Sequence, residues 1–99
     1  MLAIIGHVRV APEQIEPMRA AMQAQIEATR AEKGCHAYSY SIDVLDPGVI
    51  RVNELWESRE HLAAHFKSPH MAVWRTALAD VGFSERSLKA YPLGEPETI

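Results

Sequence analysis

Alternation of apolar and polar residues at the start of the chain predicts a β-strand over residues 2–10. Ile4, Gly6, Val8 and Val10 fall on one face of this strand, and we expect that face to meet the core. A glycine inside a strand indicates either a bulge or the close approach of another group, so Gly6 marks a point of tight packing.

The next segment changes to a helical period. Pro12 and Glu13 suit a first helical turn, because proline needs no backbone hydrogen there and an acid complements the helix dipole. Apolar positions then recur at spacings of three and four until Gly34, a candidate C-cap. The residues of this stripe are Ile15, Met18, Met22, Ile26 and Thr29. The pattern predicts a helix that packs through this stripe against the core.

Two alternating segments with a turn between them predict a hairpin. Residues 35–44 form the first strand, and residues 49–56 form the returning strand. Asp46-Pro47-Gly48 lies between them, and proline and glycine there pre-set the backbone of a turn. One side of the first strand carries His36, Tyr38, Tyr40, Ile42 and Val44.

The next part of the chain predicts a helix broken in two. Ser58 is an N-cap candidate for a short helix over 59–67. Ser68 and Pro69 restart the helix, with the serine as cap and the proline in the first turn, and the second part runs to about Asp80. Because Pro69 cannot continue the preceding hydrogen-bond ladder, the break is expected at this position.

Residues 83–91 read as a final strand, and residues 92–99 as a short C-terminal tail. The predicted order is βαββααβ, a ferredoxin-like α+β unit with a four-stranded antiparallel sheet and a single domain over residues 1–99. Helices cover one face of such a sheet. We therefore expect a second copy of the chain to cover the other face.

Composition limits the kinds of partner. The chain has 99 residues and a formal net charge of −3, and its basic residues are scattered, which disfavours nucleic-acid binding. No apolar run is long enough for a membrane span, and no signal-peptide pattern opens the sequence. The lone Cys35 packs as a small hydrophobe or offers a reactive thiol, and no CxxC motif favours the thiol. These features predict a cytoplasmic protein.

Three of the five histidines lie within residues 53–74, namely His61, His65 and His70. His61 and His65 form an HxxxH pair, but Leu62 stands where a zinc protease needs a glutamate, so the metal signal is weak. A zinc or iron site that uses His70 as a third ligand stays an alternative. A surface role for His61 and a local hydrogen bond for His70 are the simpler interpretations.

His65 follows Leu62 by three positions, so we expect it to lie between helix and sheet. It is either a hydrogen-bonded core histidine or the base of a pocket. On the returning strand Glu54 and Trp56 share a face, and if that face meets the helices a carboxylate and an indole lie beneath His65. Glu54 would then be nearly buried and would need a partner, for which a histidine or an arginine is the natural candidate.

Several runs together resemble the signature of the antibiotic biosynthesis monooxygenase (ABM) family. They are ELWES from residue 54, HL from residue 61, His65, and SPHM from residue 68. GCHAY from residue 34 and the opening MLAIIGHVRVAP are similar to the corresponding segments of bacterial quinol monooxygenases. The resemblance covers nearly the whole chain, and it is more specific for the fold than for a substrate.

The resemblance implies a homodimeric α+β barrel with a pocket between sheet and helices in each protomer. It implies oxidation of a quinol or polycyclic phenol by O2 without a cofactor or a metal. His65 is then the expected catalytic base or proton relay. The expected substrate-binding residues are Trp56, Tyr40, Asn53, Glu54, His70 and Phe66. The alternative is a non-catalytic dimer of the same fold, either a small-molecule-binding protein or a stress-related protein.

Two other branches of the superfamily fit less well. The haem-degrading branch carries an asparagine on its first strand, where this chain has Gly6 and His7. An isomerase branch acts on phosphorylated compounds and needs basic residues that converge on the pocket. From the sequence, only Arg51 or Arg75 is placed to do so.

Overall fold

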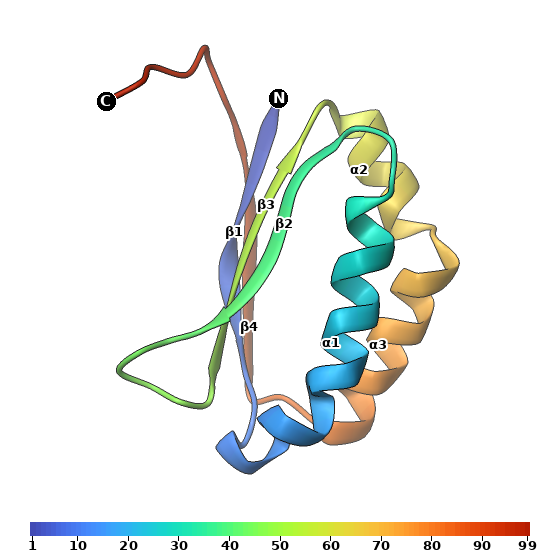
Figure 1. The fold of residues 1–99 in the computed structure, drawn as a ribbon, viewed down its shortest axis with the longest axis vertical. Coiled ribbons are helices and arrows are strands. Elements are labelled where there is room, and N and C mark those ends of the chain that lie inside the picture. Colours follow the sequence, from blue (N-terminus) through green and yellow to red (C-terminus); the bar gives the residue numbers. More distant parts are fainter.

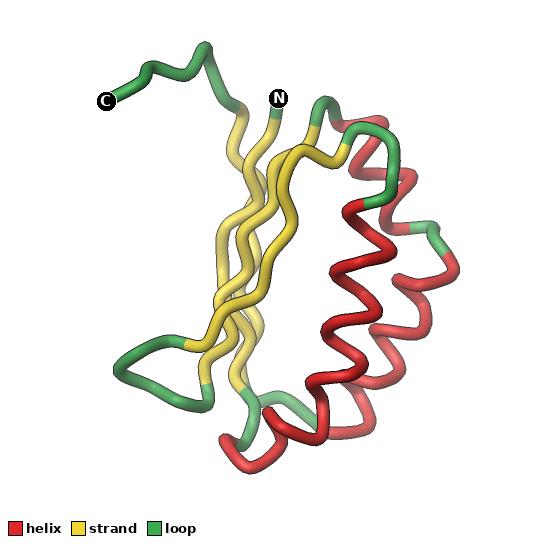
Figure 2. Tube along the Cα trace, viewed as in Figure 1, coloured by secondary structure: helices red, strands yellow, loops and turns green.

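The computed structural model describes residues 1–99 and has two layers, a four-stranded antiparallel sheet and a layer of helices (Figure 1). The predicted βαββααβ order is confirmed, with strand order β2-β3-β1-β4 in the sheet. All helices lie on one face of the sheet (Figure 2). The elements are β1 (Leu2–Arg9), a 3-10 turn (Pro12–Gln14), α1 (Ile15–Arg30), β2 (Cys35–Ile42), β3 (Val49–Trp56), α2 (Arg59–Phe66), α3 (Pro69–Val81) and β4 (Glu85–Pro92).

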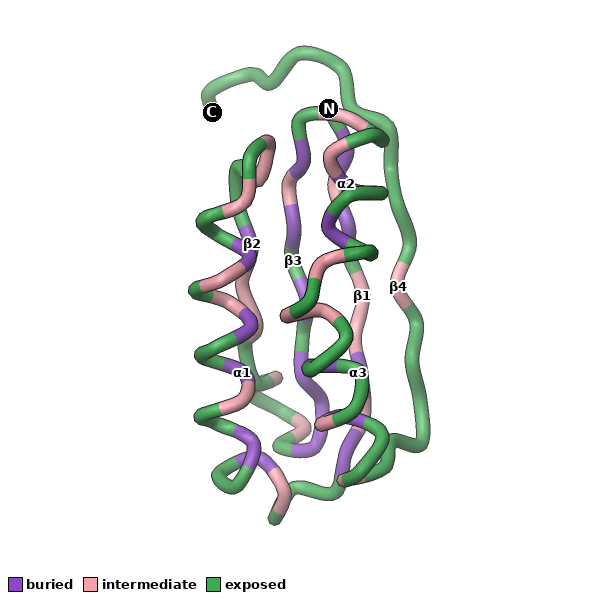
Figure 3. The backbone as a smooth tube through the Cα atoms, turned by 90° about the vertical axis from the view of Figure 1, so that its right-hand side faces the viewer, coloured by how far each residue is buried: buried purple, intermediate pink, exposed green.

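The two central strands, β1 and β3, supply most of the sheet's contribution to the core (Figure 3). On β1 the alternation predicted from the sequence is confirmed, since Ile4 and Val8 are buried while Ile5 is 54% exposed. On β3 the face that carries Glu54 and Trp56 turns toward the helices, and both residues are buried. The edge strand β4 is exposed along nearly its whole length.

Gly6 lies where β1 and β4 approach most tightly. Gly6 pairs with Val52 on β3 and with Leu88 on β4. The register is regular on both sides, so no bulge forms there. A Cβ at this position would lie 1.8 Å from the carbonyl oxygen of Ser87. The close approach is therefore the reason that a glycine occupies this strand position.

The buried face of α1 differs by one position from the predicted stripe. Met18, Met22 and Thr29 are buried as expected, but Gln25 takes the inner position and Ile26 is only half-buried. The Gln25 side chain is tolerated inside because its Nε2 donates a hydrogen bond to the hydroxyl of Tyr38 at 3.2 Å. Gln25, whose side chain has a partner in the tertiary structure, therefore takes the buried position that the pattern predicted for Ile26.

The hairpin is confirmed, but its first strand is shorter than predicted. Strand β2 ends at Ile42 rather than at residue 44, and Val44 is 98% exposed in the turn. Pairing with β3 shifts between Cys35 and Ala37. The residue between them, His36, is exposed, and its Nε2 lies 2.7 Å from Glu57 Oε2. Strand β4 begins at Glu85, two residues later than predicted.

The predicted N-caps of α2 and of α3 are both confirmed. The Ser58 hydroxyl accepts a hydrogen bond from the backbone N–H of His61, and Ser68 accepts one from Met71. Pro69 occupies the first turn of α3, and Gly82 ends that helix with a φ of +77°. The two caps and Pro69 fix the angle between α2 and α3, which positions the side chains discussed below.

The second face of the sheet carries no helix (Figure 1). The predicted second copy of the chain over this face stays a prediction, as does the cytoplasmic location. None of the helices is both long and apolar enough to cross a membrane.

We expect Gly6→Ala to lower the free energy of unfolding by about 2–3 kcal/mol, because β4 must move away from the added methyl group. Chemical denaturation monitored by circular dichroism measures the change. Gly94→Ala is the matched control, since a Cβ at Gly94 meets nothing within 4 Å. Equal stability of the Gly6 variant and the parent chain would contradict the tight β1–β4 contact.

Candidate functional site

A pocket of about 600 Å³ lies between the sheet and the helices. One wall comes from the four strands of the sheet, and the facing wall comes from α2 and α3. Most lining residues are apolar, and the polar ones that reach the interior are Tyr38, Tyr40, Glu54 and His65. An apolar cleft with a few convergent polar groups is the usual form of a small-molecule site.

His65 projects from the last turn of α2 into the space under the helix and is 1% exposed. Its ring lies 4.8 Å from the ring centre of Trp56 and 5.5 Å from that of Tyr38. The predicted place of His65 between helix and sheet is therefore confirmed. Leu62, three positions earlier, is also buried and turns the same face of α2 toward the sheet.

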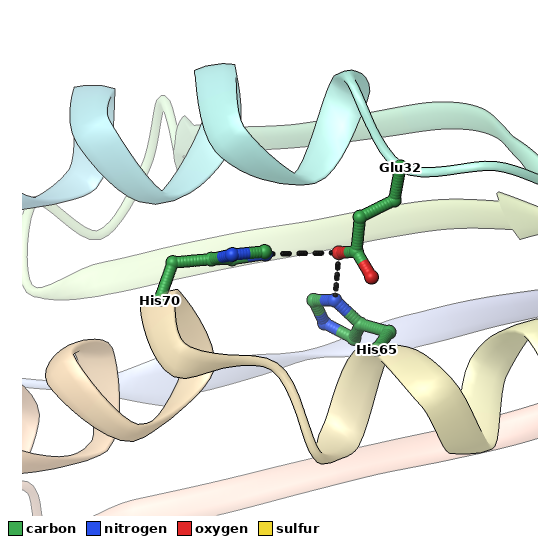
Figure 4. Close-up of side chains that lie close together, drawn as sticks. All are labelled: Glu32, His65 and His70. Atoms are coloured by element: carbon green, nitrogen blue, oxygen red, sulfur yellow. Dashed lines mark hydrogen bonds and ion pairs between the residues drawn. The ribbon is translucent and has the colours of Figure 1, made fainter.

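A carboxylate from a distant part of the chain holds this imidazole (Figure 4). Glu32, in the loop after α1, places its Oε2 2.6 Å from Nδ1 of His65 and 2.9 Å from Nε2 of His70. Because a carboxylate only accepts hydrogen bonds, each imidazole donates an N–H to this oxygen. Nε2 of His65 makes no hydrogen bond within the protein, so it is left to accept a proton or a hydrogen bond.

The protein environment keeps His65 neutral. Burial lowers the pKa of its imidazole below the ordinary value of 6.5, and the hydrogen bond to Glu32 only partly opposes this. The positive charge of Arg75 acts in the same direction as burial. At neutral pH the ring is therefore uncharged and can act as a base.

Glu54 is the second titratable group inside the pocket. It is 8% exposed, and burial raises its pKa to about 7. Its Oε1 accepts a hydrogen bond of 2.8 Å from the indole N–H of Trp56. The expected histidine or arginine partner of Glu54 is therefore wrong, because the indole two residues later on the same strand fills that place.

Tyr38 and Tyr40 place two hydroxyls together in the pocket wall, 2.6 Å apart. Burial raises the pKa of Tyr38 to about 12, and burial also raises that of Tyr40. Both hydroxyls therefore keep their protons at neutral pH, and because one of them donates to the other, the pair has one O–H left to donate to another group. Tyr40 also borders a separate depression of about 520 Å³ between α1 and β2, in which His65 and Glu54 take no part.

The structure brings together most, but not all, of the residues proposed from the sequence. Tyr40, Glu54, His65 and Phe66 line the pocket. Trp56 is fully buried behind His65 instead of forming a wall, and His70 reaches the site only through Glu32. Asn53 is exposed on the opposite face of the sheet, so the structure does not bring it to the pocket.

Glu32 is the site residue that sequence reasoning missed. It lies 33 positions before His65 in a loop, and no periodicity or motif points to it. In the sequence, only Gly34 pointed indirectly to the position of Glu32. Its φ of +82° turns the chain after α1, and a Cβ there would lie 2.3 Å from Cγ of His61. This tight turn brings the loop with Glu32 against the helix that carries His65.

Glu32, His65 and His70 also form a set of possible metal ligands, whose donor atoms lie within 4.8 Å of one another. The set differs from the histidine trio considered from the sequence, because His61 instead contacts Ser58. Donor atoms around zinc at about 2.1 Å lie roughly 3.4 Å apart. The 2.6 and 2.9 Å separations here are hydrogen-bond lengths, so the carboxylate would have to move away from both rings to admit an ion.

Comparison with known proteins identifies the family. The family model for antibiotic biosynthesis monooxygenases matches residues 1–77, from β1 into α3. The chain belongs to the ABM family. The resemblance seen in the sequence is thereby confirmed.

Individual ABM relatives agree with this assignment. The Escherichia coli K12 protein named "Probable quinol monooxygenase YgiN" is 34% identical over 88 residues, which cover 79% of this chain and 85% of that protein. A crystal structure from Deinococcus radiodurans matches with a TM-score of 0.92 at 26% identity, covering 100% of this chain and 98% of that one. Rv0793 from Mycobacterium tuberculosis matches with a TM-score of 0.84 at 28% identity, covering 97% and 98% of the two chains.

The raised pKa of Glu54 predicts a stability that depends on pH. In the unfolded chain this carboxyl ionises near pH 4.5, but in the fold it stays protonated up to about pH 7. Its contribution to stability is therefore complete below pH 4.5 and lost as pH rises through 7. Glu54→Gln removes the buried charge and keeps an oxygen for the indole of Trp56. We expect it to raise the free energy of unfolding by about 2 kcal/mol at about pH 8.

Denaturation of both chains across the range from about pH 4 to pH 8 measures this difference. The advantage of the glutamine variant should vanish at the acid end. Glu57→Gln is the control with the opposite sign, because the contact with His36 lowers the pKa of that exposed carboxyl. A Glu54 variant that is less stable than the parent at the alkaline end would contradict the burial of an unpaired charge.

Proposed function

We propose that this ABM protein is a cofactor-independent monooxygenase that oxidises a quinol or a polycyclic phenol with O2. The observation that carries the proposal is His65, a buried neutral imidazole whose Nδ1 is bound to Glu32 and whose ring lines an aromatic pocket. The name of the Escherichia coli relative supports a quinol as the substrate class.

The first step is removal of a proton from a substrate hydroxyl. Glu32 accepts the Nδ1–H of His65 and so fixes the tautomer in which Nε2 is unprotonated. Nε2 takes the hydroxyl proton, and the imidazolium that forms lies 2.6 Å from the Glu32 carboxylate, which stabilises its charge. The flat phenolic ring is held by the aromatic and aliphatic wall of the pocket.

Deprotonation prepares the substrate for oxygen. The electron-rich anion transfers one electron to O2, and the resulting superoxide and organic radical combine at a ring carbon. The peroxide anion that forms takes the proton back from His65 to give a hydroperoxide. Loss of the ring proton and cleavage of the O–O bond then leave a carbonyl on the ring and release water. For a hydroquinone, one O2 is consumed and the products are the anion of an acidic hydroxyquinone, one water and one proton, so the substrate supplies all the electrons.

Glu54 and the tyrosine pair suit the anionic stages of this sequence. Protonated Glu54 offers one hydrogen-bond donor inside the apolar pocket, and the Tyr38–Tyr40 pair offers a second, because only one of its two hydroxyl protons is used in the bond between them. Donors that are already oriented stabilise a developing negative charge more effectively in such a pocket than in water. We assign these three groups to binding of the substrate oxygens.

Ionisation of the acidic hydroxyquinone product leaves a proton on His65, and this proton must reach solvent before the next turnover. Glu32 Oε2 joins the imidazole of His65 to that of His70, and the His70 side chain is 25% exposed against 1% for His65. The same two hydrogen bonds that hold the base therefore form a path toward solvent. We assign His70 to this proton transfer rather than to contact with the substrate.

We also infer that a second copy of the chain covers the open face of the sheet. Ile5, on that face, is 54% exposed, and the half-buried Leu55 lies on the same face of β3, opposite Ala3. Apolar side chains on a bare sheet face are typical of an interface between subunits. Such a dimer would match the barrel expected from the sequence.

Oxygen uptake with menadiol tests the proposed activity. We expect metal-stripped protein to consume O2 well above a blank without protein, and His65→Ala to lower the rate roughly a hundredfold, the usual contribution of a general base. The blank is needed because quinols react with oxygen unaided. Uptake equal to the blank with menadiol and with polycyclic phenols would favour the non-catalytic binding role instead.

Glu32→Gln separates a positioning role from a structural one. We expect roughly a tenfold lower kcat, because the amide no longer fixes the tautomer of His65 or stabilises its positive charge. Glu32 raises the pKa of His65, so its loss should also move the acid limb of the pH–rate profile to lower pH. Glu27→Gln, on the exposed face of α1, is the control. If the acid limb of the pH–rate profile is unchanged in the Glu32 variant, Glu32 does not influence the protonation of His65 during turnover.

We expect His70→Asn to slow turnover in weak buffer without changing KM, because His70 passes the proton to solvent. Added imidazole should restore the rate by replacing the missing group. His36→Asn is the matched control, since His36 is exposed and pairs with Glu57 away from the pocket. A rate defect that imidazole leaves untouched would assign His70 a structural role only.

A further inference from the structure

Glu32, His65 and His70 bring three metal-binding atoms together from three separate segments of the chain. Glu32 lies in the loop after α1, His65 in the last turn of α2 and His70 in the first turn of α3. One carboxylate oxygen and two imidazole nitrogens converge from different directions, and all three lie within 4.8 Å of one another (Figure 4). Two histidines and one glutamate are a donor set that holds zinc in enzymes, with water as the fourth ligand.

The carboxylate in this cluster has no permanent cation as a partner. The Glu32 side chain contacts only the two imidazoles, whereas Asp43, for example, pairs with an arginine. Arg75 is the permanent cation whose charge acts on His65, but its guanidinium donates to the backbone oxygen of Phe66. The two neutral rings and the carboxylate therefore carry a net negative charge, which favours a divalent cation at this point.

A metal ion requires small movements of the two outer ligands. Donor atoms around zinc lie roughly 3.4 Å apart, which is roughly 0.5–0.8 Å more than the 2.9 and 2.6 Å between the oxygen and the two nitrogens. The ring of His65 is fixed, because it packs against Trp56 and Tyr38. The Glu32 and His70 side chains are 17% and 25% exposed, so they have space on the solvent side in which to adjust. Water can reach the fourth ligand position from the same side.

One nitrogen of His65 cannot hold a proton and a metal ion together. In the hydrogen-bonded state Nδ1 carries the proton of the ring and donates to Glu32, so Nε2 is unprotonated. A histidine nitrogen that binds a metal must itself be unprotonated. A neutral ring that binds an ion through Nδ1 therefore carries its one proton on Nε2. In that tautomer Nε2 donates a hydrogen bond and cannot take a proton from a substrate hydroxyl.

We propose that Glu32, His65 and His70 reversibly bind one Zn²⁺ ion, and that the bound ion moves the proton of His65 from Nδ1 to Nε2. Zn²⁺ fits this cluster because it binds imidazole nitrogen together with carboxylate oxygen and accepts a tetrahedral site. The ion is an inhibitor and not a cofactor, because it removes the base that the proposed reaction uses. The site itself stands on the geometry of three side chains, and only the inhibition rests on the proposed function.

Calorimetric titration with Zn²⁺ tests the site in the full chain, stripped of metal and without a histidine tag. We expect one ion per chain. Glu32→Gln and His70→Asn should each weaken binding by roughly a hundredfold, because each removes one of three ligands. His36→Asn is the matched control and should keep the affinity, since His36 is exposed and pairs with Glu57. Mg²⁺ should not compete with zinc, because it prefers oxygen ligands.

Nitrogen NMR of the histidine rings tests the tautomer. The chemical shift of a ring nitrogen differs strongly between its protonated and unprotonated forms, so the two nitrogens of His65 can be followed separately. Near neutral pH we expect the proton on Nδ1 without zinc and on Nε2 with one equivalent of zinc. His61 is the internal control, because its Nδ1 contacts Ser58 outside the cluster and should not change.

Oxygen uptake with menadiol tests the inhibition separately. One equivalent of Zn²⁺ should lower the rate of the metal-free protein roughly a hundredfold, the usual contribution of a general base, and a chelator should restore it. A blank with zinc and without protein corrects for the unaided reaction. If the metal-free protein consumes no oxygen above the blank, the proposed function fails, while calorimetry and NMR still decide the site and the tautomer.

Three results would overturn the proposal. Absence of zinc binding, or binding that survives in both Glu32→Gln and His70→Asn, would show that these side chains form no site. Zinc bound in the cluster with the proton of His65 still on Nδ1 would refute the change of tautomer. Undiminished oxygen uptake by the zinc-bound protein would refute the inhibition. Circular dichroism checks the fold of each variant, and the NMR and uptake measurements need no substitution.

Discussion

The hydrogen bond between Glu32 and His65 is the contact on which the organisation of the pocket depends. It joins the loop after α1 to the last turn of α2, and through His70 it reaches the first turn of α3. One carboxylate oxygen thus ties three helical segments together where the helix layer is broken. The same contact decides which nitrogen of the buried imidazole is left without a proton. The packing of these helical segments and the tautomer of His65 therefore both depend on one oxygen of Glu32.

Burial acts on the two titratable groups of the pocket in opposite directions. It lowers the pKa of His65 and raises that of Glu54, because in each case it disfavours the charged form. The result near neutral pH is a neutral base and an acid that keeps its proton in a large fraction of the molecules, both in one apolar cleft. A cleft in which one group accepts protons and another donates hydrogen bonds suits a reaction that passes through an anion. Trp56 stabilises this arrangement, since its indole packs on His65 and donates to Glu54.

Desolvation determines the electrostatics of the pocket interior. It disfavours the charged forms of His65 and Glu54, and the wall around them is aromatic and aliphatic. The orientation of a bound ring matters for a reaction with O2, because only the ring position next to the base and the donors is then presented for attack.

Much of the fold was readable from the sequence because the signals are local. The alternation of Ile4 and Val8 on β1, the caps Ser58 and Ser68, and the inward face of β3 each depend on residues a few positions apart. The sequence alone therefore determined the order of the elements, the break between α2 and α3, and the burial of His65 beside Trp56. Only the tertiary structure decided which groups meet these residues. It places Glu32 rather than Glu54 at the imidazole, and an indole rather than a cation at Glu54. Periodicity and capping act within a turn or a strand, whereas partners from separate elements are chosen by how the helices pack on the sheet.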